Sequence, residues 1–228
     1  MIKLQEGIYW TGYIDWNLRN FHGYSTPSGS TYNAYLIVDE HPTLIDTVKY
    51  YGYQEMLERL RAIIDPAKIE YIISNHTEMD HSGSIDALLA VCPKAQVVCS
   101  PQGRTGLIRH FKKNWNMKVV ATGETLSTGK YTLQFFHMPM VHWPDSMATY
   151  CQEPRILFPN DAFGQHYASS ERFADQIAPG VVVGEATKYY ANIVMPYGAQ
   201  VVKVLEVLKR LPIDMICPSH GLIWRNRQ

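Results

Sequence analysis

Four side chains that can bind metal ions fall within six residues of one polar segment, His76-Thr77-Glu78-Met79-Asp80-His81. If the segment is extended, alternation points His76, Glu78 and Asp80 to one side. A turn at His81 would then let the segment supply ligands to two metals. Packing these groups together without a cation would bury like charges and unpaired donors. The spacing therefore predicts a metal site.

Three more candidate ligands follow later in the chain, each in a short polar segment. His142 lies beside Trp143 and Pro144, Asp161 follows the apolar run 155–158, and His220 follows the run 213–217. Each is ambiguous alone, because a single His or Asp is more often a hydrogen-bonded polar residue. Together the seven ligands suffice for two four-coordinate metals if one carboxylate bridges them: His76, Glu78, Asp80, His81, His142, Asp161 and His220.

The elements that must position these residues are a mixture of strands and helices. Strands are expected at residues 8–14, 32–38, 43–47, 69–74, 97–99, 131–136, 147–151, 155–158 and 213–217. Helices are expected at 54–64, 84–91, 184–190 and 198–210, with a tight turn and a candidate helix cap at 82–84. Strand runs followed twice by alternating strands and helices predict an αββα sandwich of the α+β class. No linker or repeat interrupts the pattern, so residues 1–228 are expected to form one domain.

Composition excludes several classes of partner. The chain has 21 Lys and Arg against 21 Asp and Glu and no basic cluster, which disfavours nucleic acid or an anionic membrane as a partner.

Its four cysteines include no CxxC pair and are expected to be buried and reduced: Cys92, Cys99, Cys151 and Cys217. No signal peptide is evident, and no run approaches the roughly 18 apolar residues of a membrane span. A soluble cytoplasmic protein is expected.

The complete pattern resembles the diiron domain of the flavodiiron proteins, which are oxygen and nitric oxide reductases of the metallo-β-lactamase superfamily. The resemblance rests on the HxExDH segment, the later His142, Asp161 after a strand and the final Ser219-His220-Gly221. It extends to residues 21–26, 44–47 and 188–192. It implies one iron on His76, Glu78 and His142, and a second on Asp80, His81 and His220. Asp161 would bridge the two irons together with a hydroxide or oxo group.

The resemblance also implies roles for residues around the metals. His22, Tyr24 and Tyr190 correspond to positions near the substrate pocket of the family, where their polar hydrogens can donate to substrate. The alternative is that they are ordinary buried aromatic residues with locally satisfied polar atoms. Asp46 ends an apolar strand and is the candidate to accept the second N–H of a ligating imidazole. Its alternative role is that of an ordinary turn residue.

Glu78 distinguishes this pattern from the zinc hydrolases of the superfamily, which usually read HxHxDH. Glutamate replaces an imidazole by a hard anionic oxygen and leaves four imidazoles and three carboxylates. Two divalent metals would then be balanced by these carboxylates and a bridging hydroxide. Mixed nitrogen and oxygen ligation without thiolate suits redox-active iron or manganese, although zinc also binds such groups readily.

The resemblance implies an oxidoreductase that reduces O₂ to water, NO to N₂O, or both, with electrons from a flavodoxin- or rubredoxin-type donor. The family carries FMN on a C-terminal flavodoxin domain, whereas this chain ends eight residues after His220. FMN is therefore expected only on a separate domain or partner. Two alternatives stay open, an O₂ sensor with slow turnover and a zinc hydrolase. Because family members pair head to tail, a homodimer is a candidate assembly.

Overall fold

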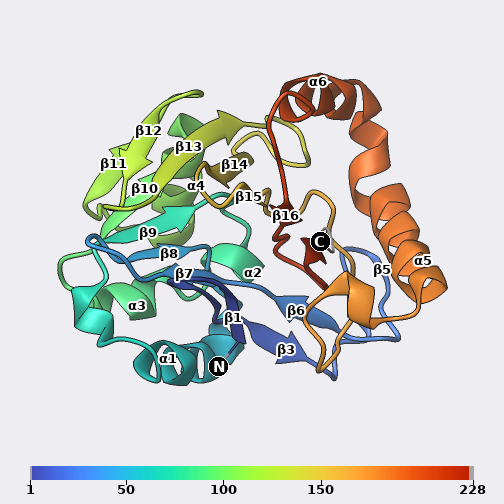
Figure 1. Ribbon diagram of the computed structural model, residues 1–228, viewed down its shortest axis with the longest axis horizontal. Helices are drawn as coiled ribbons and strands as arrows, with labels where there is room; N and C mark the ends of the chain where they lie inside the picture. The colour runs from blue at the N-terminus through green and yellow to red at the C-terminus, as the bar shows by residue number, and fades with distance from the viewer. Residues whose placement is uncertain (1, 226–228) are drawn as a thin grey trace.

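Two mixed sheets stand at the centre of the computed structural model, which describes residues 2–225 (Figure 1). The first sheet has the order β1-β2-β7-β8-β9-β10-β11 and is antiparallel from β1 to β8 and parallel from β8 to β11. Its strands are β1 Ile2–Gln5, β2 Ile8–Trp10, β7 Tyr35–Ile37, β8 Thr43–Ile45, β9 Tyr71–Ser74, β10 Gln96–Cys99 and β11 Met117–Val119.

The second sheet has the order β12-β13-β14-β15-β16-β17 and is antiparallel except for the pair β15 and β16. Its strands are β12 Thr125–Ser127, β13 Thr132–His137, β14 Met147–Cys151, β15 Ile156–Phe158, β16 Met215–Ile216 and β17 Trp224–Arg225. Two small ribbons pair β3 Tyr13–Asp15 with β6 Ser30–Tyr32 and β4 Asn20–Phe21 with β5 Tyr24–Ser25.

Helices cover both outer faces of the sheet pair (Figure 1). They are α1 Tyr53–Arg61, α2 Met79–Ser82, α3 Ile85–Val91, α4 Pro101–Phe111, α5 Pro179–Tyr189 and α6 Gly198–Leu208. A π-helical segment, Tyr190–Val194, continues α5. Short 3₁₀ turns lie at Tyr50–Gly52, Pro66–Lys68, Ala174–Gln176 and Met195–Tyr197. No helix among the described residues combines the length and hydrophobicity needed to cross a bilayer.

Alternation along the strands creates the layers. In β8 and β9, Ile45 and Ile73 face the second sheet, while Leu44 and Ile72 face α1 and α3. Sheet-to-sheet packing is completed by Phe135 of β13, and the other outer face packs against α5 and α6. The expected αββα arrangement of the α+β class is therefore confirmed. The four cysteines are buried and unpaired, as expected.

Several expected boundaries are wrong. The strands expected at 8–14 and 32–38 each divide in two, giving β2 with β3 and β6 with β7. The chain bends at Gly12, where a Cβ atom would lie 2.3 Å from the carbonyl oxygen of Tyr32, so only glycine permits this crossing. The expected cap also fails: the hydroxyl of Ser84 donates to Val48 O and not to the backbone of α3.

Candidate metal centre

The ligand-rich segment begins as an extended chain after β9 and then turns into the single helical turn α2. The backbone N–H groups of His81 and Ser82 both donate to Glu78 O, at 2.9 Å. The carbonyl oxygen of His81 in turn accepts from Thr47, which follows β8. The expected extended alternation is therefore wrong for Asp80, whereas the turn expected at His81 is present. Their side chains project from a helical turn, and this turn directs them to a different place from His76 and Glu78.

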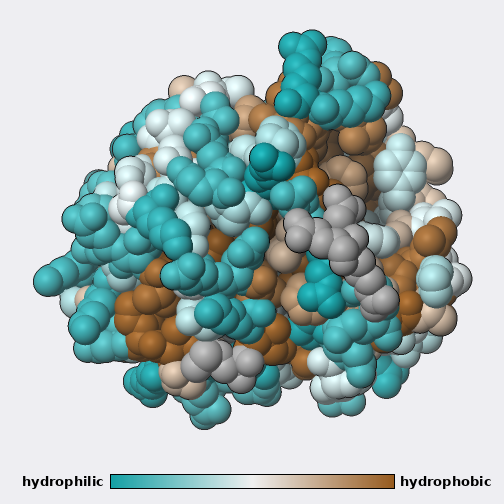
Figure 2. Space-filling model, viewed as in Figure 1, coloured by the Kyte–Doolittle hydropathy of each residue, from teal (hydrophilic) through white to brown (hydrophobic). Residues whose placement is uncertain are grey.

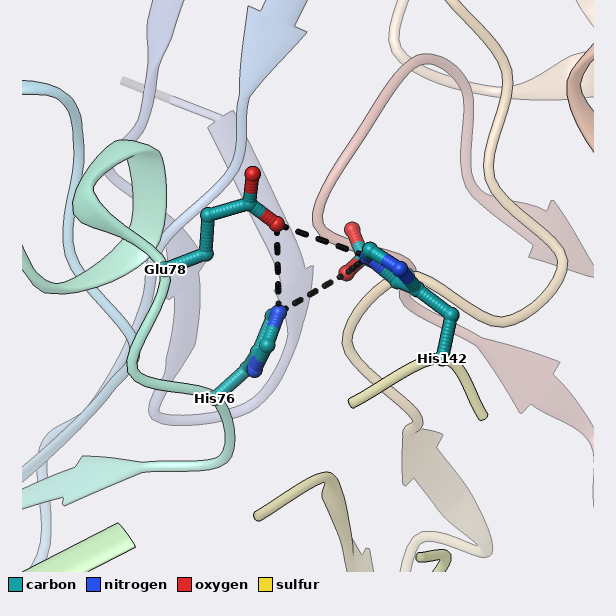
Figure 3. Close-up of side chains that lie close together, drawn as sticks. His76, Glu78 and His142 are labelled. Atoms are coloured by element: carbon teal, nitrogen blue, oxygen red, sulfur yellow. Dashed lines mark hydrogen bonds and ion pairs between the residues drawn. The ribbon is translucent and has the colours of Figure 1, made fainter. Parts of the chain in front are cut away.

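The seven candidate ligands lie in two adjoining groups. In each group, one ligand atom per residue lies within 4.8 Å of all the others. The first group is His76, Glu78, His142 and Asp161, and the second is Asp80, His81 and His220. Figure 3 shows the imidazoles of His76 and His142 and the carboxylate of Glu78 pointing toward one another. The Nε2 atom of His76 lies 3.3 Å from Glu78 Oε2, and that of His142 lies 3.4 Å from the same oxygen.

Asp161 stands between the two groups. Its Oδ2 atom lies 3.6 Å from His76 Nε2 and 3.3 Å from His142 Nε2. Its Oδ1 atom lies 3.2 Å from His81 Nε2 and 3.4 Å from His220 Nε2. Each oxygen therefore faces one group, which is the arrangement that a bridging carboxylate requires.

The donor set fits metal ions better than a hydrogen-bonded network. Buried polar atoms nearly always have a hydrogen-bond partner. Here the buried atoms without one include both carboxylate oxygens of Asp80, both ring nitrogens of His81 and the Nε2 atoms of His142 and His220. Asp161 Oδ2 belongs to the same set. Since these atoms converge, cations placed among them would satisfy them.

The electrostatics of the cluster also favour cations. Burial opposes charge on His81 and His142, but Asp80 and Asp161 raise the pKa of His81 to about 9. Asp161 and Glu78 likewise raise the pKa of His142 to about 9. Burial works against the charge of Asp161 too, yet the surrounding imidazoles hold its pKa well below the ordinary value. The carboxylates thus attract positive charge, which a metal ion can supply in exchange for protons.

Residues behind the ligands orient two of the imidazoles. Asp145 Oδ2 accepts from His76 Nδ1 at 2.9 Å and from Thr77 N at 2.7 Å. His220 Nδ1 donates to the carbonyl oxygen of Thr31 at 2.6 Å. Both contacts leave Nε2 for a metal. Asp145 was missed in the sequence, although a carboxylate three residues after the candidate ligand His142 was a usable signal.

Asp46 does not hydrogen-bond an imidazole, so that prediction is wrong. Its buried carboxylate accepts from Asn75 N at 2.8 Å, Asn75 Nδ2 at 3.0 Å and Asn160 Nδ2 at 3.1 Å. Asn75 and Asn160 directly precede the candidate ligands His76 and Asp161. Asp46 therefore ties together the two loops that carry these ligands.

The three predicted pocket residues occupy different places. His22 Nε2 lies 3.4 Å from Glu78 Oε1, at the edge of the site. The hydroxyl of Tyr24 is buried without a hydrogen-bond partner. Tyr190 is 43% exposed, and no contact with a candidate ligand is found for it. Its neighbour Tyr189 is buried instead and donates to Asp161 Oδ1 at 3.0 Å. Adjacent helical residues point about 100° apart, so only one of the two tyrosines can face the cluster.

An apolar cavity of about 370 Å³ lies between α5, the π-helical segment and α6. Its wall includes Val141 and Ala162, which adjoin the candidate ligands His142 and Asp161, as well as Tyr189. Figure 2 shows hydrophobic surface in the hollow beside α6. Tyr190 lines the same cavity. The cavity thus lies next to the loops that carry His142 and Asp161 and is lined mainly by apolar side chains.

Comparison with known proteins places these observations in a family. Residues 31–221 match the model described as ODP family beta lactamase. A Moorella thermoacetica protein named nitric oxide reductase is 47% identical over 98% of this chain and 57% of its own length. The rubredoxin-oxygen oxidoreductase of Megalodesulfovibrio gigas is 44% identical over 98% of this chain and 56% of its own.

Solved structures agree. The rubredoxin oxygen:oxidoreductase from Desulfovibrio gigas superposes with a TM-score of 0.96 at 44% identity, covering 98% of this chain and 57% of that one. The flavodiiron protein from Giardia intestinalis gives a TM-score of 0.96 at 42% identity, covering 99% and 55%. The chain spans a little over half the length of the curated relatives it matches.

Proposed function

Because this chain belongs to the ODP beta-lactamase family and has the metallo-β-lactamase-like fold of the flavodiiron proteins, we propose that it is a diiron oxidoreductase. The proposed reaction is reduction of O₂ to water, of NO to N₂O, or of both. The observation that carries this proposal is the placement of the ligand groups on either side of Asp161, one facing each carboxylate oxygen.

In this proposal His76, Glu78 and His142 hold one iron, and Asp80, His81 and His220 hold the other, with Asp161 shared. When bound, the irons would supply the one-electron redox chemistry that this reaction needs. Asp145 and the carbonyl oxygen of Thr31 orient two of the imidazoles. Glu78 adds a third carboxylate to the set, which favours iron over zinc.

The surrounding residues would admit and protonate the substrate. The apolar cavity beside Val141 and Ala162 suits small uncharged molecules such as O₂ and NO better than a charged ester or lactam. Reduction to water or N₂O consumes protons, which groups with polar hydrogens next to the site can deliver. His22 beside Glu78 and the unpartnered hydroxyl of Tyr24 are the proposed donors. Tyr189, which contacts Asp161, joins them in place of Tyr190.

Electrons must come from outside the described residues. One of the relatives is named for rubredoxin and others are named flavorubredoxins. We therefore propose a flavodoxin- or rubredoxin-type donor, with FMN carried on another domain or protein. A homodimer, in which a donor on one subunit could face the site of the other, is part of the same proposal.

The test combines metal analysis with reaction kinetics. Protein from iron-sufficient cells should contain about two irons per chain, and after anaerobic reduction it should consume O₂ or NO repeatedly when reduced flavin is supplied. The variant Glu78→His, which restores the zinc-hydrolase pattern, should shift metal content from iron toward zinc and lose this activity. A spectral change that persists for minutes after O₂ addition, without turnover, would indicate a sensor. Zinc with ester hydrolysis and no redox response would overturn the proposal.

A further inference from the structure

A row of neighbouring polar side chains leads from β6 to Glu78, hydrogen-bonded as far as His22. Ser30 Oγ lies 2.7 Å from His166 Nδ1, and His166 Nε2 lies 3.2 Å from His22 Nδ1. His22 Nε2 then lies 3.4 Å from Glu78 Oε1. Ser30 and His166 are fully buried, and the side chain of His22 is only 7% exposed. The row therefore runs through the protein interior and ends on a candidate metal ligand.

The hydroxyl of Ser30 sets the direction of the row at its inner end. Two acceptors lie near it, His166 Nδ1 at 2.7 Å and the carbonyl oxygen of Thr31 at 3.3 Å. The shorter distance is typical for an O–H donor, while the longer one is outside the usual range. The hydroxyl therefore donates to Nδ1 of His166, which must be unprotonated. The ring is then neutral, and its one proton lies on Nε2.

The proton positions along the rest of the row follow from this. Because His166 Nε2–H points at His22 Nδ1, that nitrogen accepts, and the proton of His22 lies on Nε2. His22 Nε2 lies 3.4 Å from Oε1 of Glu78, longer than a well-formed hydrogen bond, but the negative charge of this carboxylate favours a proton on the nitrogen that faces it. The opposite direction would place a bare nitrogen lone pair against the carboxylate. Both ends of the row therefore require the same direction.

The two oxygens of Glu78 are thereby given different partners. Oε2 faces His76 and His142 in the first ligand group, whereas Oε1 faces His22. We propose that Ser30 and His166 are positioning residues that keep the proton of His22 on Nε2, so that His22 holds the outer oxygen of Glu78 and leaves the inner one for the metal. This inference rests on the proposed metal site and deepens it.

The proton positions can be read directly by ¹⁵N NMR of the zinc-loaded, histidine-labelled chain, since zinc is diamagnetic. Both His22 and His166 should show a protonated Nε2 and an unprotonated Nδ1. Ser30→Ala removes the donor at the inner end and should mix or reverse the two tautomers. His110→Gln, at an exposed position on α4, is the matched control and should leave the His22 and His166 signals unchanged. A protonated Nδ1 on either ring of the unmodified chain would overturn the proposal.

Metal affinity supplies a second readout that a purely structural role would not reproduce. Residues that orient metal ligands typically change affinity 10- to 100-fold. His166→Leu should therefore weaken ferrous iron binding at the Glu78 group about tenfold in an anaerobic chelator competition. His166→Gln keeps an N–H donor toward His22 and should recover most of this loss.

Equal affinities for the Leu and Gln variants, both folded, would contradict the positioning role. If the tautomers are as expected but the loaded chain consumes neither O₂ nor NO, the proposed function fails and this inference stands.

Discussion

Replacing Asp145 by alanine is expected to weaken iron binding by 10- to 100-fold, the usual effect of losing a carboxylate that orients a ligating imidazole. That loss corresponds to about 1.4–2.7 kcal/mol. Asp145 is 5% exposed, and its Oδ2 atom accepts from both His76 Nδ1 and Thr77 N. Alanine leaves both buried donors without an acceptor, which costs about 1–3 kcal/mol of folding free energy for each donor. Asp145→Asn can keep an acceptor oxygen but loses the charge, so its effects should be smaller.

The assay is an anaerobic titration with ferrous iron against a chromophoric chelator, with urea unfolding of the metal-free chain alongside. Asp86→Ala is the matched control, because Asp86 is a half-exposed carboxylate paired with Lys113 at 2.7 Å. Such a surface pair contributes at most about 1 kcal/mol, and iron affinity should not change. A folded Asp145→Ala variant with unaltered iron affinity would refute the claim that Asp145 orients His76.

Four further outcomes are expected. The raised pKa values of His81 and His142, about 9, mean that metal must displace their protons, so iron affinity in competition titrations should increase with pH until about 9 and then level off. Because folding raises these two pKa values, protonation of His81 and His142 stabilises the folded metal-free chain fully below the ordinary histidine pKa. This stabilisation is lost as pH rises through about 9, so less urea should unfold the chain above pH 9. In the variant Asp46→Asn, asparagine can adopt the positive φ of 55°, but its amide group directs an N–H toward the donor of Asn75 or Asn160. The free energy of unfolding measured in urea should therefore fall by about 1–3 kcal/mol. Removing metal with a chelator should lower the melting temperature in calorimetry, since metal at about 1,000 times its Kd adds about 4 kcal/mol to the free energy of unfolding. An unchanged melting temperature would argue against a tightly bound metal.

The fold and the grouping of the candidate ligands could be predicted because their signals are local. Apolar runs identify strands such as β14, expected at 147–151 and found at Met147–Cys151. Polar residues directly after such runs, including His76 and His220, lie at strand ends where loops meet. The spacing of the motif then predicted that the remaining candidate ligands lie in the same region.

The features that were missed depend on contacts distant in sequence. Asp145 reaches His76 across 69 residues, so no local pattern announces the pair. The turn α2 has only four residues and is held by Thr47 from another loop. Tyr189 and Tyr190 are adjacent, and only the packing of α5 decides which of them meets Asp161.

The spacing of the two candidate ligand groups is set by tertiary structure more than by the HxExDH motif itself. Asp46 follows β8 and Asn75 follows β9, both in the first sheet, whereas Asn160 follows β15 in the second. One carboxylate thus bonds loops from both sheets, and the next residue in two of these loops is a candidate ligand. A shift between the sheets would therefore move Asp161 relative to His76 and must first break hydrogen bonds to Asp46. This coupling gives the buried carboxylate of Asp46 a role although it does not contact the candidate metal site. Through its hydrogen bonds, the rigid pair of sheets fixes the distance between His76 and Asp161.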